Sequence, residues 1–326
     1  MYFGLMIAIF VIGYAMIALE HPLKINKSAT AVLLAAVIWA VFALFGPGIK
    51  DGALIHHLGE TAEILFFLLG AMTIVEIVDK HDGFSIITDR ITTTSKRKLL
   101  WIISILTFFM SAVLDNLTTS IVMCALLRKL VGDKNTRWFF AGMVILAANA
   151  GGAWSPIGDV TTIMLWIKGN ITAGSIILET IIPSLVSLLV PVAIIGMTMK
   201  GKLERPEKVV VEGTSSVTRK QSLLILCMGV GLLLFVPFFK TITHLPPYLG
   251  ILFGLGILWI TTEIMHKNNP TNYSRLNVTA IIQKVDVPSV LFFLGILMAV
   301  SCLNEAGHLG QLAGALNELG NVYVIN

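Results

Sequence analysis

Long apolar stretches without charge constrain this chain more than any other feature. Seven stretches of 18 to 22 residues contain no Asp, Glu, Lys or Arg. An α-helix rises about 1.5 Å per residue, so each stretch can cross about 30 Å of hydrocarbon. The stretches are Met1 to Leu19, Ser28 to Ile49, Trp138 to Gly158, Thr180 to Met199, Gln221 to Phe239, Thr241 to Thr262 and Val287 to Asn304. They predict an all-α polytopic membrane protein whose main surroundings are the lipid bilayer.

The composition agrees with this prediction. Of the 326 residues, 56% are hydrophobic and 13% are charged, and the mean hydropathy is +0.86. A soluble domain carries about twice that charged fraction. The net charge of +4 comes from short basic clusters between apolar runs, without a basic stripe interleaved with aromatic residues. The pattern therefore argues against a nucleic-acid partner.

Residues 99 to 127 differ from the other apolar regions. Two apolar arms, each shorter than a full span, meet here at Asp115 and Asn116. We interpret this region as a re-entrant helical hairpin, which enters and leaves the membrane by one side. A further span, near Gly59 to Val78, contains Glu60, Glu63 and Glu76, which we interpret mainly as interfacial residues or helix-end partners of Lys80.

The distribution of basic residues supports the hairpin. Cytoplasmic loops are enriched in Lys and Arg. With the N-terminus outside and the hairpin re-entrant, 20 of the 23 Lys and Arg residues lie on the cytoplasmic side, and only Lys50, Lys168 and Lys240 lie outside. If residues 99 to 127 crossed once, every later loop would change sides and the asymmetry would be lost.

A weak internal repeat divides the chain. Leu65-Phe66-Phe67-Leu68 recurs as Leu291-Phe292-Phe293-Leu294, and the two copies run in opposite directions in the layout above. This pattern is typical of inverted-repeat transporters. We predict a first repeat over residues 1–199, a cytoplasmic linker over 200–220 and a truncated second repeat over 221–326. On this repeat a complete protein would reach about 420 residues, so we expect the sequence to be a fragment.

The region 138–167 contains helix-breaking residues within an apolar span. Gly151 and Gly152 loosen the backbone, and Pro156 cannot donate a helical hydrogen bond. We predict a discontinuous helix, with the first half ending near residues 148–151 and the second starting with Ser155 as N-cap and Pro156 at the first position. Asp159 would then lie in the first turn of the second half, where the helix dipole favours a carboxylate.

Polar side chains gather at the hairpin tip and at this break. An ionised carboxylate at mid-bilayer costs about 2.5 to 3.5 kcal/mol, so Asp115 and Asp159 are candidates for function, although each also suits a helix cap. Carboxylates, hydroxyls and free carbonyls can replace the water shell of a small cation such as Na⁺. The candidate ion- and proton-binding residues are Asp115, Asn116, Thr118, Thr119, Asn149, Ser155, Asp159, Thr161 and Thr162.

Other chemistries receive little support from the sequence. The three cysteines lie singly in apolar runs, and the seven histidines lie at segment ends or in loops, which argues against a disulfide framework, haem, zinc or a buried imidazole relay. An intramembrane hydrolase built on Ser155 and Asp159 would lack a nearby base, and no phosphate-binding loop is present. We therefore predict a transporter without a cofactor, not an enzyme.

Two motifs identify a family. The segments SAVLDNLTTSIVM (Ser111 to Met123) and NAGGAWSPIGDVTTIMLW (Asn149 to Trp166) resemble the signatures of NhaD-type sodium/proton antiporters of the ion transporter (arsenite/NhaD) superfamily. The resemblance implies inverted repeats, each with a hairpin and a broken helix. It also carries over Asp115, Asn116, Thr118, Asp159, Thr161 and Thr162 as ion-site residues.

The resemblance implies a function as well. Asp115 and Asp159 would alternately bind Na⁺ or Li⁺ and H⁺, and exchange them across a bacterial cytoplasmic (inner) membrane in a multi-pass protein. Relatives in the superfamily transport dicarboxylates or arsenite, and an anion transporter is the alternative, but two buried acids argue against an anion at this place. A homodimer is compatible with the sequence, in which no motif specifies the oligomeric state.

Overall fold

The computed structural model describes residues 2–49, 51–88, 90–203, 217–267 and 276–318. Over these ranges the chain is helical, and the one strand-like pairing is an isolated bridge between Ser95 and Lys202. Seven of the described helices are long and apolar enough to cross a membrane. They are α3 (Lys27–Phe45), α4 (Ala53–Lys80), α6 (Lys96–Leu114), α10 (Ala173–Thr198), α11 (Arg219–Thr243), α12 (Pro247–His266) and α15 (Val287–Glu305). The predicted all-α polytopic class is confirmed.

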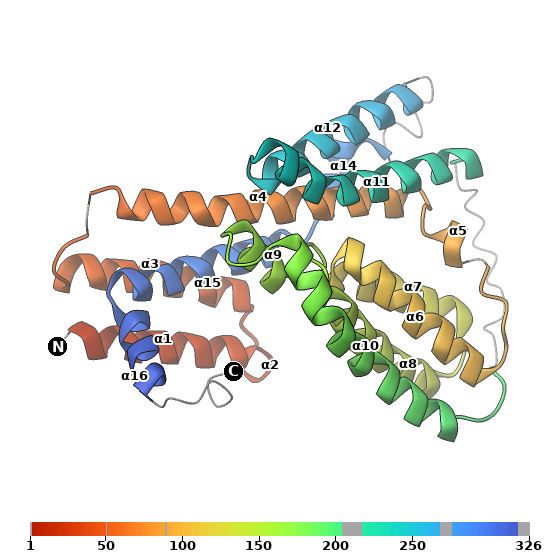
Figure 1. The fold of residues 1–326 in the computed structure, drawn as a ribbon, viewed down its shortest axis with the longest axis horizontal. Coiled ribbons are helices and arrows are strands. Elements are labelled where there is room, and N and C mark those ends of the chain that lie inside the picture. Colours follow the sequence, from red (N-terminus) through yellow and green to blue (C-terminus); the bar gives the residue numbers. More distant parts are fainter. Residues whose placement is uncertain (1, 50, 89, 204–216, 268–275, 319–326) are drawn as a thin grey trace. The chain divides into compact units, whose positions relative to one another are not determined.

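The chain contains two compact units, which we describe separately. The first consists of residues 1–68 and 286–326. In it α1 (Tyr2–Ala18), α3 and α15 pack together, with α2 (Glu20–Leu23) between α1 and α3 and α16 (His308–Glu318) after α15 (Figure 1). Helices α3 and α15 approach closely at Gly295. A Cβ atom at this position would lie 2.4 Å from the carbonyl carbon of Ala31, so the contact requires a glycine.

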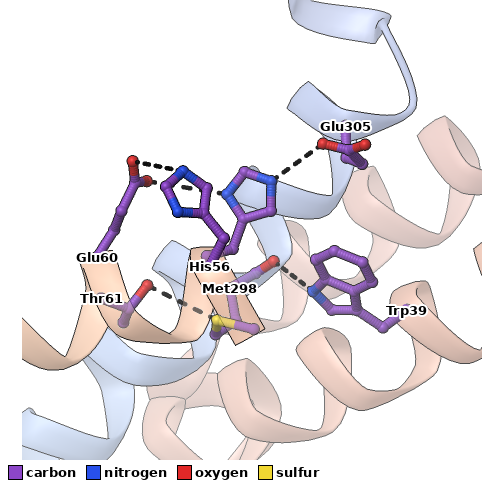
Figure 2. Close-up of polar contacts among 7 residues, drawn as sticks. Trp39, His56, Glu60, Thr61, Met298 and Glu305 are labelled. Carbon is purple, nitrogen blue, oxygen red and sulfur yellow. Dashed lines mark hydrogen bonds and ion pairs between the residues drawn. The ribbon is translucent and has the colours of Figure 1, made fainter. Parts of the chain in front are cut away.

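Polar contacts tie the start of α4 to α3 and α15 within the first unit (Figure 2). His57 is buried, and its Nε2 lies 3.2 Å from Glu305 Oε2 at the end of α15. Trp39 Nε1 donates to the carbonyl oxygen of Met298 over 2.9 Å, and Thr61 Oγ1 donates to the sulfur of the same residue. These bonds satisfy polar groups that would otherwise be unpaired in an apolar core.

The second unit consists of residues 69–285 and contains both predicted motifs. Helices α6, α8 (Lys134–Ala153) and α10 pack side by side, and α7 (Asn116–Leu130) packs on α6 and α8 (Figure 1). Three shorter helices also belong to this unit: α5 (Ser85–Thr88), α9 (Val160–Ile167) and α14 (Val278–Ile282). Helix α10 ends and α11 begins near the predicted linker boundaries, but residues 204–216 of the linker and residues 268–275 and 319–326 of the second repeat lie outside the described residues. The repeat boundaries stay a prediction.

Helices α6 and α7 form a hairpin with Asp115 at its tip. The start of α6 lies near the start of α8, and Lys96 Nζ donates to Thr136 Oγ1 there over 3.3 Å. One expectation was wrong: α6 has 19 residues and is long enough to cross a membrane, whereas α7 has 15. Helix α6 begins before the apolar run because the Ser95 side chain caps it by accepting from the Lys98 amide. That both arms enter from one side of the membrane stays a prediction.

Gly151 and Gly152 lie inside α8, so the prediction that they end this helix was wrong. Their function is close packing: a Cβ on Gly151 would lie 2.1 Å from the carbonyl oxygen of Phe108 in α6. A Cβ on Gly152 would lie 2.4 Å from the carbonyl oxygen of Gly158. These two glycines bring α8 against the hairpin, and tertiary contact offsets their low helix propensity.

Two histidines form a buried pair, which the position of the histidines at segment ends or in loops did not predict. His81 follows α4 directly, His266 ends α12, and the exposed fractions are 0% and 2%. His81 Nδ1 lies 2.7 Å from the carbonyl oxygen of Ile77, which requires a proton on Nδ1. His81 Nε2 therefore accepts from His266 Nε2, 3.0 Å away. Burial lowers the pKa of His81 to about 4, although the bond to Ile77 opposes this shift.

The His81 pair predicts acid sensitivity. The pKa of His81 is about 4 in the folded protein and 6.5 in the unfolded chain. Between pH 4 and 6.5 the unfolded chain is therefore protonated at His81, and folding must remove this proton. The stabilisation is complete above about pH 6.5 and is lost as the pH falls toward 4, by about 3 kcal/mol in total. We expect His81→Gln to flatten this part of the pH dependence in thermal unfolding. The exposed His21→Gln should keep the wild-type profile, and equal profiles for both variants would contradict the assignment.

Gly151 offers a direct test of the packing of α6 against α8. Gly151→Ala should lower the stability by about 1 to 3 kcal/mol, because the new methyl group overlaps the Phe108 carbonyl. Gly142 lies in the same helix with nothing within 4 Å of its Cβ position, so Gly142→Ala should be neutral or raise the stability by up to about 1 kcal/mol. Thermal unfolding in detergent measures both, and equal melting temperatures would refute the proposed contact.

Candidate ion-binding site

The discontinuous helix is present, but its second half starts later than predicted. Helix α8 ends at Ala153 and α9 begins at Val160, with Asp159 as its N-cap. Asp159 Oδ1 accepts from the Thr161 amide over 2.8 Å. The expectation that Ser155 is the N-cap, with Pro156 at the first helical position, was wrong. Pro156 lies within the break, where its missing amide removes one donor that would need a partner.

The Ser155 hydroxyl has a different partner from the predicted one. Ser155 Oγ donates to the carbonyl oxygen of Ala112 over 2.5 Å, at the last turn of α6. The last carbonyls of a helix have no internal donor, so this bond satisfies one of them and fixes the break against the hairpin. Thr162 Oγ1 closes the break from the other end, within 2.9 Å of the carbonyl oxygen of Ser155 and 2.8 Å of that of Asp159. Ser155 and Thr162 therefore have structural partners.

Three residues that hold the break were not predicted from the sequence. Trp154 stacks on Phe108, with ring centroids 5.9 Å apart and an interplanar angle of 20°. Ser111 Oγ donates to the carbonyl oxygen of Ala148 over 2.6 Å. The position of Ser111, four residues before Asp115 on an apolar helix, is the signal that could have identified it.

Asp115 forms the hairpin tip with a backbone conformation that is uncommon for a residue with a side chain. Its φ is 74° and its ψ is 159°, a combination that costs about 1 to 3 kcal/mol outside glycine. Both carboxylate oxygens bind Thr118: Oδ1 accepts from the amide and Oδ2 from the hydroxyl, each over 2.8 Å. Asp115 is thus the N-cap of α7, at the position where the two arms meet.

Asn116 joins the hairpin to the broken helix. Its Nδ2 donates to Asp159 Oδ2 over 2.6 Å and to Asn149 Oδ1 over 2.9 Å. Asn149 Nδ2 in turn donates to the carbonyl oxygen of Ile145 over 3.0 Å. The two sequence motifs therefore meet through one side-chain amide, and Asp115 is the neighbour of that amide in the chain.

The remaining predicted residues are distributed around this junction. Thr118 binds Asp115, and Thr161 contributes its backbone amide to Asp159 while its side chain is exposed. Thr119 is fully buried, and its hydroxyl has no hydrogen-bond partner among the described residues. The structure thus brings together Asn116, Asn149 and Asp159, with Asp115 and Thr118 adjacent, and uses Ser155 and Thr162 to hold the backbone.

The junction presents carboxylate and amide oxygens near the carboxyl end of α8, where the helix dipole is negative. Within the described residues, no three His, Cys, Asp or Glu side chains are grouped as a metal site would require. Oxygen ligands of this kind suit a small, hard cation better than a transition metal.

The comparisons with known proteins are consistent with the two motifs. The profile of the citrate transporter family (CitMHS) matches residues 7–325. Sodium/proton antiporter 1 of Arabidopsis thaliana is 46% identical over 325 residues, which cover 98% of this chain and 56% of that protein. For sodium/proton antiporter 2 of the same plant the identity is 43%, with 98% and 77% covered. The Na⁺/H⁺ antiporter NhaD of Alkalimonas amylolytica is 30% identical over 342 residues, with 96% and 70% covered.

The match to the family extends over nearly the whole chain, whereas the chain spans about half the length of the first of these relatives. The family consists of membrane transporters, in agreement with the prediction that this chain is not an enzyme. The chain belongs to the citrate transporter family and, within it, to the group of the NhaD-type sodium/proton antiporters.

Proposed function

We propose that this protein exchanges sodium for protons across a membrane, and that Asp159 and Asp115 bind the two ions alternately. The observation that carries the proposal is the Asn116 amide, which contacts the carboxylate of Asp159 and the amide oxygen of Asn149. This contact gathers oxygen ligands from the hairpin and the broken helix at one point. The relatives named sodium/proton antiporters support the same function.

Asp159 is the proposed exchanging group. In the structure its Oδ2 accepts from Asn116 and its Oδ1 from the Thr161 amide, so the carboxylate is held in one orientation. A carboxylate offers about four acceptor positions, which leaves room for either a proton or a sodium ion beside these donors. A proton and a cation compete for the same negative charge, and this competition couples the two flows.

Asn116 can serve both states of the site. An Asn side chain offers donors from its nitrogen and an acceptor from its oxygen. Donation from Nδ2 stabilises the ionised carboxylate without a cation, and rotation of the amide presents Oδ1 to a bound sodium ion. Asn149, on the next helix, supplies a second amide oxygen.

Asp115 has a second role in the proposal. Its two oxygens bind Thr118, which fixes the first turn of α7 and hence the place of Asn116. We propose that the charge of Asp115 also attracts the cation and takes part in proton exchange. Lithium, similar in charge and coordination chemistry, would use the same oxygens.

The arrangement in the membrane follows from the distribution of basic residues. We propose that the N-terminus lies outside and that the basic loops face the cytoplasm. The multi-pass membrane location agrees with the seven apolar helices among the described residues. The family includes plant and bacterial relatives, and a bacterial cytoplasmic membrane is our proposal for this chain.

Substitution of the two acids tests the site. Sodium-dependent collapse of a proton gradient in everted vesicles should fall at least a hundredfold with Asp159→Asn and with Asp115→Asn, because the amide keeps the shape but cannot exchange a proton. Asp133→Asn is the matched control, since Asp133 caps α8 through the Thr136 amide in the same way but lies outside the site. It should exchange at the wild-type rate. Unchanged exchange in both site variants would remove the proposed site.

The same vesicles separate the cation proposal from its alternative. Family members described as citrate transporters raise the question of an anionic substrate. Proton movement driven by citrate or a dicarboxylate, with no response to sodium, would contradict the cation proposal and favour anion transport.

The Asn116 contact makes an independent prediction. Asn116→Ala should raise the sodium concentration for half-maximal exchange by about tenfold or more, because one amide contact of the site is lost. Asn277→Ala removes an Asn that caps the short helix α14, away from the junction, and should leave this concentration within a factor of two. An identical sodium dependence for Asn116→Ala and the wild type would show that the amide does not contact the ion.

A further inference from the structure

A groove of about 500 Å³ lies between α8 and α10, directly beside the candidate site. Its walls include Asn149, whose amide oxygen belongs to the junction described above. Three further polar residues line it from α10: Thr180, Ser184 and Ser187. A groove of this size has room for several water molecules.

The three hydroxyl residues share one face of α10, because they are spaced four and three residues apart. Most of the other exposed positions of this helix are apolar, with exposed fractions of 77% for Leu178, 67% for Ile182 and 59% for Ile194, although Glu179 and Thr198 are exposed too. Helix α10 is long and apolar enough to cross a membrane. A hydroxyl on such a helix needs a polar partner, because hydrocarbon provides none. The partner is either a carbonyl of its own helix, as the Ile176 carbonyl is for Thr180, or water.

Ser184 shows that this partner is not supplied by the described protein. Its exposed fraction is 5%, it lines the groove, and its hydroxyl has no hydrogen bond to another described residue. Among the described residues, its oxygen is not one of the fully buried atoms without a partner, so it is accessible from the groove. It stays hydrated only if the groove holds water. The unpaired hydroxyl therefore points to water or to a hydrated ion in the groove.

The backbone next to Ser184 adds acceptors. Pro183 lies inside α10 and also lines the groove, and it cannot donate to the carbonyl four residues earlier. Thr180 Oγ1 donates to the carbonyl oxygen of Ile176 in its own helix and lies 3.3 Å from the carbonyl oxygen of Ala153, at the end of α8 where the break begins. The hydroxyl line thus leads from Ser187 to the break itself.

We propose that this groove is a water-filled access path, through which a hydrated sodium ion reaches Asn149 and then Asp159. The inference rests on the proposed function and extends it to the route of the ion. Ser184 lies midway along the path and offers an oxygen to an ion that has begun to lose its water shell.

Thiol accessibility tests the path in the full-length native protein. Cys124, Cys227 and Cys302 are first replaced by Ser, and Ser184→Cys or Ile182→Cys is then introduced. The two positions are two residues apart on α10, one in the groove and one on the exposed apolar face. In vesicles with a positively charged methanethiosulfonate reagent on both sides, the Ser184→Cys thiol should react at least tenfold faster than the Ile182→Cys thiol. Saturating sodium should slow the reaction at position 184 and not at position 182.

Blocking the groove gives a second measurement. Ser184→Trp should lower sodium/proton exchange at least tenfold, whereas Ile182→Trp places the same ring on the apolar face and should keep exchange within a factor of two. Equal thiol reactivity at positions 184 and 182 would overturn the path, as the groove would then be dry. If the two thiols react equally but Asp159→Asn abolishes exchange in the same preparation, the access path is contradicted and the proposed ion site is not. If Asp159→Asn exchanges normally, the proposed site fails and the path fails with it.

Discussion

The main constraint on this structure is that polar backbone groups within the membrane need partners inside the protein. Two breaks in the helices of the second unit leave backbone groups without helical partners, one at Asp115 and one at residues 154–159. Side chains supply the missing hydrogen bonds at both breaks. Asp115 and Asp159 accept from amides in the first turns of α7 and α9, and Ser155 donates to a carbonyl at the end of α6. The acids that we assign to ion exchange are also the groups that make the breaks stable.

This double role explains how the site can be both rigid and reactive. The close contact at Gly151 and the stacking of Trp154 on Phe108 fix the broken helix against the hairpin. The Asn116 amide then lies between Asp159 and Asn149 without a long flexible connection. In our proposal, a cation or a proton that binds Asp159 changes the partner of this amide.

The sequence predicted the parts whose signal is local. Charge-free stretches located five of the seven candidate membrane helices in the described residues, namely α3, α10, α11, α12 and α15. The two acids in apolar surroundings located the hairpin tip and the break. The contact of Asn116 with Asp159 could not be predicted, because it joins residues 43 positions apart and depends on how α6 and α8 pack. The same packing explains the errors: Gly151 and Gly152 serve helix contact instead of helix ending, and Ser155 binds a carbonyl of another helix. The contact of His81 with His266 could not be predicted either, because the two residues lie 185 positions apart in the sequence.

Proton release from the purified protein in a weakly buffered solution tests the central claim most directly. If sodium and protons compete for Asp159, addition of sodium at a pH where the carboxyl is partly protonated must release protons, and potassium at the same concentration must not. Asp159→Asn should release none. Sodium binding by the wild-type protein without proton release would contradict the competition on which this account is built.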